Sequence, residues 1–129
     1  ELADGTNIWM VGPKTMEEHI IPCFEASGNY SPEIVAGMPI VLTNNIDHAK
    51  ESIGKSLAVY GQLPSYRAML DREGAVGPAD IAIIGDENKL GGEIKRLESL
   101  GVTDFNAAIM DVEDGAYHRT LEFLGSLRP

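Results

Sequence analysis

The apolar stretch IVAGMPIVL, residues 34–42, decides the fold class of this chain. Its residues are apolar at odd and even positions alike, which is typical of a strand buried on both faces of a parallel sheet. Pro39 removes one backbone donor from the strand, and the polar residues 43–45 close it. Strand and helix patterns alternate on either side, so the sequence predicts an α/β fold of parallel strands joined by right-handed helical crossovers.

Apolar periodicity and breaker residues predict the order of the elements. Strand patterns lie at residues 6–11, 34–42 and 102–110, and helical patterns lie at residues 13–26, 47–60, 65–73, 87–100 and 114–127. Residues 81–84 are too short for periodicity to decide between strand and helix. No linker, low-complexity segment or repeat divides the chain, so residues 1–129 are predicted to form a single unit.

Individual residues predict how these helices begin, bend and pack. We expect Pro22 to kink the first helix, and Gly74 and Gly101 to end two of the others. The expected N-caps are three aspartates, Asp47, Asp86 and Asp114. The expected buried stripes are Ile53, Leu57 and Tyr60 in the second helical stretch and Tyr117, Leu121 and Leu124 in the last one.

Length, composition and charge exclude several classes of protein. With 129 residues the chain is long enough for one compact domain but not for a complete eight-stranded barrel of about 250 residues. Hydrophobic residues make up 43% and charged residues 23%, as in a soluble globular protein. No apolar run is long enough to span a bilayer and no signal segment opens the chain, so a membrane location is disfavoured. The net charge of −10 disfavours binding to nucleic acid.

The single cysteine, Cys23, cannot form an intrachain disulfide. It lies between Pro22 and Phe24 in an apolar stretch, so we expect a buried thiol, and this cysteine usage favours a reducing cytoplasm. The chain has no initiator methionine, and residues 1–5 resemble the last turn of a helix that ends at Gly5. We therefore expect a segment of a longer protein.

Three segments lie where parallel strands end and are candidates for binding. In residues 9–15, Gly12 permits a close turn, and Lys14 and Thr15 lie in the first turn of a helix whose free amides favour a phosphate or carboxylate. A solvated Lys14 after an ordinary turn is the alternative. Trp9 and Met10 alternate faces, so one of them should point inward.

The other two strand ends offer polar groups that helix capping also explains. Residues 43–45 provide hydrogen-bonding side chains after the central strand. Asp111, Glu113 and Asp114 provide carboxylates for acid–base or metal chemistry. The three histidines lack zinc-site or triad spacing, so we predict no metal site and name no catalytic residue. The break in the helical pattern at residues 60–67 is typical of a pocket wall or a subunit contact.

Several motifs resemble the C-terminal part of luciferase-like oxidoreductases, which depend on flavin or deazaflavin (F-420). The likeness spans nearly the whole chain, and residues 60–74 are its most specific part, pointing to the deazaflavin branch. The segments that carry the resemblance are residues 1–6 (ELADGT), 9–15 (WMVGPKT), 59–74 (VYGQLPSYRAMLDREG), 77–80 (GPAD) and 85–87 (GDE).

The resemblance implies a partial (β/α)8 TIM barrel, of which this chain supplies about the last three strands while the N-terminal half is absent. It implies F-420 as the cofactor, with FMN as the alternative, and hydride transfer between the ring and an organic substrate. The family loop at residues 10–15 lies beside the cofactor, and the helix break lies near the barrel mouth. The implied cofactor-binding residues are Met10, Gly12, Pro13, Lys14 and Thr15, and the implied substrate-binding or interface residues are Trp9, Tyr60, Gln62 and Arg67.

Three hypotheses follow. In the leading one, the chain is the C-terminal portion of an F-420- or FMN-dependent oxidoreductase that acts on a small-molecule substrate. This portion forms a homo-oligomer or assembles with its missing half. The second is a stand-alone α/β module without redox activity that binds an anion at residues 12–15. The third is an interaction fragment with no catalytic activity of its own.

Overall fold

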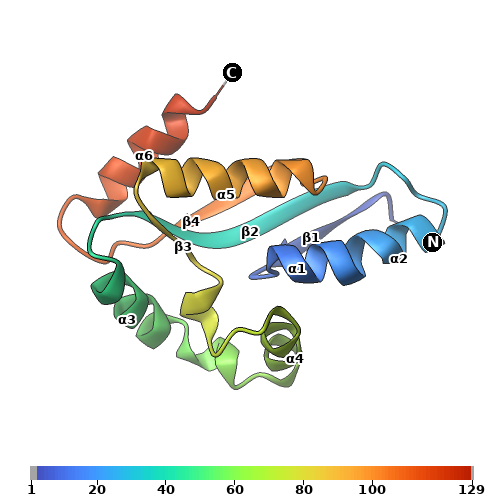
Figure 1. Cartoon of the computed structure of the whole chain (residues 1–129), viewed down its shortest axis with the longest axis horizontal. Coiled ribbons are helices and arrows are strands. Elements are labelled where there is room, and N and C mark those ends of the chain that lie inside the picture. The colour runs from blue at the N-terminus through green and yellow to red at the C-terminus, as the bar shows by residue number, and fades with distance from the viewer. Residues whose placement is uncertain (1–2, 129) are drawn as a thin grey trace.

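The computed structural model describes residues 3–128, so the expected helical turn at residues 1–5 lies partly outside the described residues. Within residues 3–128, four parallel strands and their connecting helices form the fold (Figure 1). The strands are β1 (Gly5–Trp9), β2 (Glu33–Leu42), β3 (Ile83–Gly85) and β4 (Asp104–Ile109). The helices are α1 (Pro13–Thr15), the π-helix η1 (Met16–Ile20), α2 (Ile21–Ala26), α3 (Ile46–Ser56), α4 (Pro64–Glu73), α5 (Glu87–Ser99) and α6 (Ala116–Ser126), with 3-10 turns η2 (Ala58–Gly61) and η3 (Pro78–Asp80). Gly5 begins a strand and does not end a helix.

The long strand β2 is the centre of the sheet, as its apolar sequence predicts. One edge of β2 pairs with β4, and the other edge pairs first with β1 and then with β3. Backbone bonds on the β1 and β3 edge use odd-numbered residues, such as Gly37 of β2 and Thr43 directly after it. Pro39 falls between the stretch paired with β1 and the stretch paired with β3, so its missing N–H coincides with the junction of these two strands.

The two faces of the sheet are covered unequally. Even-numbered residues of β2 pack into a core with Leu70 of α4 and Leu90 and Leu97 of α5, while Val41 packs into a smaller core with α3. On the face opposite the larger core, Asn7 of β1 and Asp104 and Asn106 of β4 are exposed. Parallel sheets are normally covered on both faces, so this end of the second face is incompletely packed.

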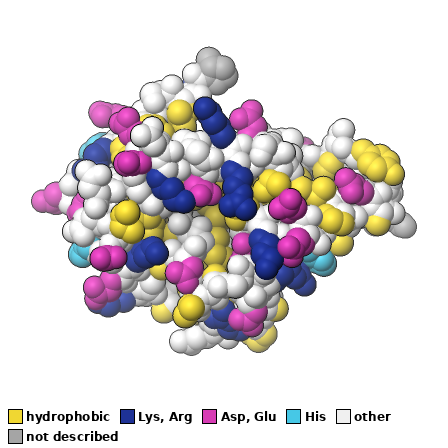
Figure 2. All heavy atoms as spheres, in the orientation of Figure 1, with side chains coloured by type: hydrophobic (Ala, Val, Ile, Leu, Met, Phe, Trp, Pro, Cys, Tyr) yellow, Lys and Arg dark blue, Asp and Glu magenta, His cyan; other side chains and the backbone are white. Residues whose placement is uncertain are grey.

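One face of the surface carries charges of both signs (Figure 2). On the face that carries α5, acidic and basic side chains are interspersed (Figure 2). None of the helices in residues 3–128 combines the length and apolar composition needed to cross a membrane.

The structure corrects two predictions within residues 6–26, one on the burial of Cys23 and one on the end of the first strand. Cys23 is exposed, because it lies on the solvent side of α2, where no residue is buried. The helix contains a π segment immediately before Pro22, in which the Ile21 N–H donates to the Met16 carbonyl. The predicted strand at residues 6–11 ends at Trp9, because Met10 adopts a left-handed conformation with φ 57° and turns the chain.

Two predicted caps and two predicted stripes are also wrong in detail. Asp86 caps α5 by accepting the Lys89 N–H at 2.8 Å, as predicted. Asp47 instead lies inside the first turn of α3, and Gly115, with φ 77°, precedes α6 in place of Asp114. Helix α3 ends at Ser56, before its predicted stripe is complete. Helix α6 buries Ala116 and Thr120; of its predicted stripe, Tyr117 and Leu121 are exposed, while Leu124 packs against the larger core as predicted. The open prediction for residues 81–84 resolves as the strand β3.

Candidate functional site

An open pocket of about 600 Å³ lies at the carboxyl ends of β2 and β3. Its lining includes Thr43, Asn44 and Asn45 after β2, Asp86 after β3, and Glu113 and Arg119 from the segment after β4. Because the strands are parallel, their carboxyl ends meet here, as they do around ligand sites in other α/β folds. The second and third candidate segments of the sequence therefore come together in one place.

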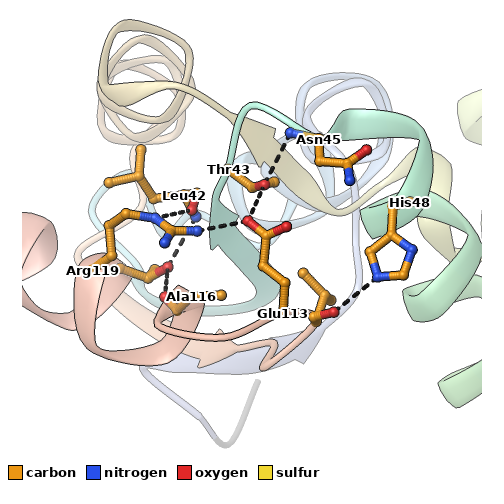
Figure 3. Close-up of polar contacts among 9 residues, drawn as sticks. Leu42, Thr43, Asn45, His48, Glu113, Ala116 and Arg119 are labelled. Atoms are coloured by element: carbon orange, nitrogen blue, oxygen red, sulfur yellow. Dashed lines mark hydrogen bonds and ion pairs between the residues drawn. The ribbon is translucent and has the colours of Figure 1, made fainter.

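Glu113 is the centre of the polar contacts in this pocket (Figure 3). Its Oε1 atom accepts a hydrogen bond of 2.7 Å from the Thr43 hydroxyl and one of 2.8 Å from Nη2 of Arg119. Arg119 also donates from Nε to the carbonyl of Leu42 at 3.0 Å. The guanidinium thus joins the end of β2 to the loop that carries Glu113.

Buried backbone contacts hold this arrangement. The Thr120 hydroxyl is fully buried, accepts the Leu42 N–H at 2.9 Å and donates to the Ala116 carbonyl at 2.6 Å. On the opposite side of Glu113, His48 of α3 contacts the Val112 carbonyl through Nε2 at 3.0 Å (Figure 3). The first turn of α6 and the first turn of α3 therefore both position the loop around Glu113.

The neighbours of Glu113 favour its ionised form. The hydrogen bond from Thr43 is the largest cause that lowers the pKa of Glu113 below its ordinary value of 4.5; burial opposes it, and Arg119 lowers the pKa further. A carboxylate with a lowered pKa is a weak base, so Glu113 is suited to accept a hydrogen bond from a ligand rather than to remove a proton. Asp111 and Asp114 are exposed and do not line this pocket.

The residues expected to bind a cofactor lie away from this pocket, after β1. Met10 is fully buried, Gly12 and Thr15 are buried, and Lys14 is exposed. The Thr15 N–H donates to Oε1 of Glu73, the last residue of α4. The backbone donor that we expected to face an external anion is therefore bound to a carboxylate of the same chain.

Two of the expected substrate residues are neighbours. The Trp9 and Tyr60 rings are in edge-to-face contact with centroids 6.3 Å apart, and Tyr66 of α4 contacts Tyr60 with centroids 4.9 Å apart. The Trp9 ring packs over Gly37, where a Cβ would lie 2.8 Å from a ring carbon. Within residues 3–128 the buried Trp9 Nε1 has no hydrogen-bond partner.

The other two expected substrate residues lie elsewhere. Gln62 is exposed. Arg67 donates to Asp71 at 2.9 Å and to the carbonyls of Ala75 and Val76 at 2.8 and 2.9 Å, so it holds the chain that leaves α4. The N–H groups of Arg67 that make these hydrogen bonds stabilise the fold and are not available to a ligand.

Sequence reasoning missed Arg119 and Glu73. Arg119 lies within the last helix, where a basic residue is usually a solvated surface group, and only its contacts with Glu113 and with the end of β2 give it a role. Glu73 ends α4 and precedes Gly74. This position predicts the end of a helix but gives no sign of the contact with Thr15. Among the described residues, no group of three or more His, Cys, Asp or Glu side chains is placed to hold a metal ion.

The loop at residues 12–15 does not fit the phosphate of a flavin or deazaflavin. Its Thr15 amide already binds Glu73, and a phosphate would have to displace that carboxylate. The pocket at the strand ends offers both donors, from Arg119 and asparagine amides, and acceptors, from Glu113 and Asp86. It therefore suits an uncharged polar group better than an anionic one.

Comparisons with known proteins support the fold. No protein-family model matches the sequence, and no curated protein matches it. A solved structure described as an F-420-dependent secondary alcohol dehydrogenase in complex with an F-420–acetone adduct matches with a TM-score of 0.64 and 18% sequence identity. The match covers 98% of this chain and 43% of that chain, so the chain spans less than half the length of this neighbour. The α/β fold with parallel strands is thus confirmed, and it corresponds to part of a TIM-barrel enzyme.

Proposed function

We propose that this chain is the C-terminal portion of an F-420-dependent oxidoreductase of the luciferase-like type. The single observation that carries the proposal is the fold match over 98% of the chain to an F-420-dependent dehydrogenase. The sequence motifs at residues 59–74 independently point to the same branch. The deazaflavin would supply the hydride, and this chain would supply part of the pocket.

Within this proposal, the pocket at the strand ends contributes to the substrate site. Arg119 and the asparagine amides donate hydrogen bonds, and the ionised Glu113 accepts one from a hydroxyl or N–H group. Thr43 and Arg119 hold the Glu113 carboxylate at a fixed orientation. The Trp9–Tyr60 pair would form an apolar wall farther along the same sheet.

The proposal also includes assembly with a second body, either the N-terminal half of the barrel or another copy of the chain. The exposed polar residues on the second face of the sheet support it, because a closed barrel encloses that face. The stand-alone anion-binding module is less well supported, because Glu73 lies at the loop on which that hypothesis depends.

The proposal is tested by equilibrium dialysis of the purified chain against F-420 and, separately, FMN, with quenching of Trp9 fluorescence as a second readout. We expect saturable binding of F-420 in preference to FMN, by this chain or by a longer gene product that contains it. Absence of F-420 binding in both would contradict the proposal.

Two variants locate the substrate site in a separate titration, which uses acetone, the organic part of the neighbour's adduct, as the probe. Arg119→Ala should weaken binding of the organic substrate about tenfold or more, the loss of one charged hydrogen bond. Lys14→Ala is the matched change of a basic residue outside the pocket, and should leave substrate binding unchanged. If Lys14→Ala weakened substrate binding and Arg119→Ala did not, the substrate site would lie at the loop at residues 12–15.

A further inference from the structure

Glu73 lies against the loop that leads from β1 into α1. Its Oε1 atom accepts the Thr15 N–H, a contact between residues 58 apart in the sequence. Gly12 is buried, and a Cβ at this position would overlap the carboxyl carbon and both oxygens of Glu73. The loop therefore holds a carboxylate at the place where its sequence predicts an external anion.

The close approach of this carboxylate explains the glycine at position 12. Gly12 has φ −74° and ψ 165°, an extended conformation that any residue adopts. The three atoms nearest to its ideal Cβ all belong to the Glu73 carboxylate. Backbone strain does not require glycine here, so the close approach of Glu73 is what excludes a side chain.

The end of α4 keeps Glu73 in this position. Gly74 adopts φ 75° and ends the helix directly after Glu73. Arg67 then holds the next two residues, Ala75 and Val76, by their carbonyls. The backbone from which the Glu73 side chain extends is thus fixed on both sides.

The start of a helix favours a negative charge, because its first N–H groups have no partner within the helix. Pro13 has no N–H, and the Met16 N–H bonds to the Gly12 carbonyl at 3.1 Å. Thr15 supplies its N–H to Glu73, and its hydroxyl, on a side chain that is 1% exposed, has no hydrogen-bond partner within residues 3–128. The turn therefore has its anion supplied from within the chain.

We propose that Glu73 is the resident anion of the loop at residues 12–15, that it closes this loop to phosphate, and that it joins α4 to the exit of β1. Glu73 is a positioning residue in this role. The anionic part of any cofactor must then be bound elsewhere. This role of Glu73 does not rest on the proposed function, because it is tested by the stability of the chain and by the NMR resonance of the Thr15 amide, both measured without any cofactor.

A double-mutant cycle tests the link between Gly12 and Glu73. Glu73→Ala removes the acceptor of the Thr15 N–H, and Gly12→Ala pushes the carboxylate away from it. Each single change should lower the folding equilibrium constant by about tenfold to a hundredfold, the range for a hydrogen bond to a charged group. The double variant should be no less stable than the Glu73→Ala variant, because both changes remove the same contact.

Inorganic phosphate tests the closure of the loop. The Thr15 amide resonance is followed in ¹H–¹⁵N spectra during titration with phosphate, against chloride at equal ionic strength. In the wild-type chain the resonance should not respond to phosphate. In the Glu73→Ala variant it should shift saturably, and in Glu73→Gln, which keeps an acceptor of the same shape, it should again not respond.

Glu93→Ala is the matched control, because Glu93 lines the same cavity of about 270 Å³ as Glu73 but pairs with Lys89 of its own helix. It should leave the Thr15 resonance unresponsive to phosphate. A saturable response in the wild-type chain, no response in Glu73→Ala, or a cost of Gly12→Ala that is equal in both backgrounds would each overturn the proposal.

Discussion

Glu113 makes the main charged contacts in the pocket at the carboxyl ends of β2 and β3. Its Oε1 atom accepts hydrogen bonds from Thr43 and from Arg119, which reach it from two different elements. A carboxylate that gains such donors on folding has a lower pKa in the folded chain than in the unfolded chain. The contribution of Glu113 to stability must therefore depend on pH.

The sign of that dependence follows from the lowered pKa. Above the ordinary value of 4.5 the carboxylate is ionised in both states, and its stabilising effect is fully present. As the pH falls through the lower pKa of the folded state, that effect is lost. We expect the difference in unfolding free energy between wild type and Glu113→Gln, measured by urea denaturation, to be constant near neutral pH and to shrink below about pH 4.5.

Glu122→Gln is the control for this measurement, because Glu122 is an exposed carboxylate on α6. Its effect on stability should be small across the same pH range. A difference between wild type and Glu113→Gln that stays constant down to pH 2 would contradict the assigned role of Thr43 and Arg119.

Thr120 contributes through its hydroxyl rather than through its size. The hydroxyl is fully buried, accepts the Leu42 N–H and donates to the Ala116 carbonyl. Thr120→Val keeps the shape but leaves the Leu42 N–H without a partner, so we expect a loss of about 1–3 kcal/mol in chemical denaturation. Thr120→Ser keeps the hydroxyl and should retain most of the stability; equal losses in both variants would show that packing, not hydrogen bonding, is what Thr120 supplies.

At the scale of elements, α6 shows how a predicted apolar stripe differs from the buried face. The stripe includes Leu121, which is 48% exposed, whereas the fully buried residues of the helix are Ala116 and Thr120. The contacts of Arg119 and Thr120 with Leu42 rotate the helix so that these residues face the end of β2. Hydrogen bonds to the sheet thus determine the orientation of α6.

This orientation predicts an unequal response of two leucines. Leu121→Gln should change the unfolding free energy of the chain by no more than about 0.5 kcal/mol, because the side chain is already half exposed. Leu97→Ala, in the core between α5 and the sheet, should cost about 2–5 kcal/mol. Thermal or urea denaturation distinguishes these outcomes, and similar losses at both positions would place the Leu121 face in contact with another body.

At the scale of the whole molecule, the sheet is open. Within residues 3–128, β4 pairs only with β2, and on the other side β1 and β3 also pair only with β2. Unpaired edges of this kind promote association with another chain. The incompletely covered face beside Asn7 and Asn106 adds to this tendency.

We therefore expect the purified 129-residue chain to associate. Sedimentation equilibrium should give an average mass above 13.9 kDa that rises with concentration. Asn106→Lys, which places a charge on the edge strand β4, should reduce this association without lowering helix content. A chain that stays monomeric and unfolds cooperatively at every concentration would contradict both the open sheet and the partial-barrel proposal.

The sequence by itself determined the central strand, the order of the strands and helices apart from β3, and three helix boundaries. The buried stretch at residues 34–42, the Asp86 cap and the helix ends at Gly74 and Gly101 all follow from interactions within a few residues. Such signals are local, so a sequence carries them directly. Asp47 and Asp114 were misplaced by short distances, because several nearby residues compete for one helix start.

Only the tertiary structure decided which of the candidate groups meet. Thr43 and Glu113 are 70 residues apart, Leu42 and Arg119 are 77 apart, and Thr15 and Glu73 are 58 apart. Periodicity and capping rules do not describe contacts across such separations, which depend on strand register and on how each helix is rotated against the sheet. For the same reason the anion expected at the loop after β1 proved to be a carboxylate of the chain itself.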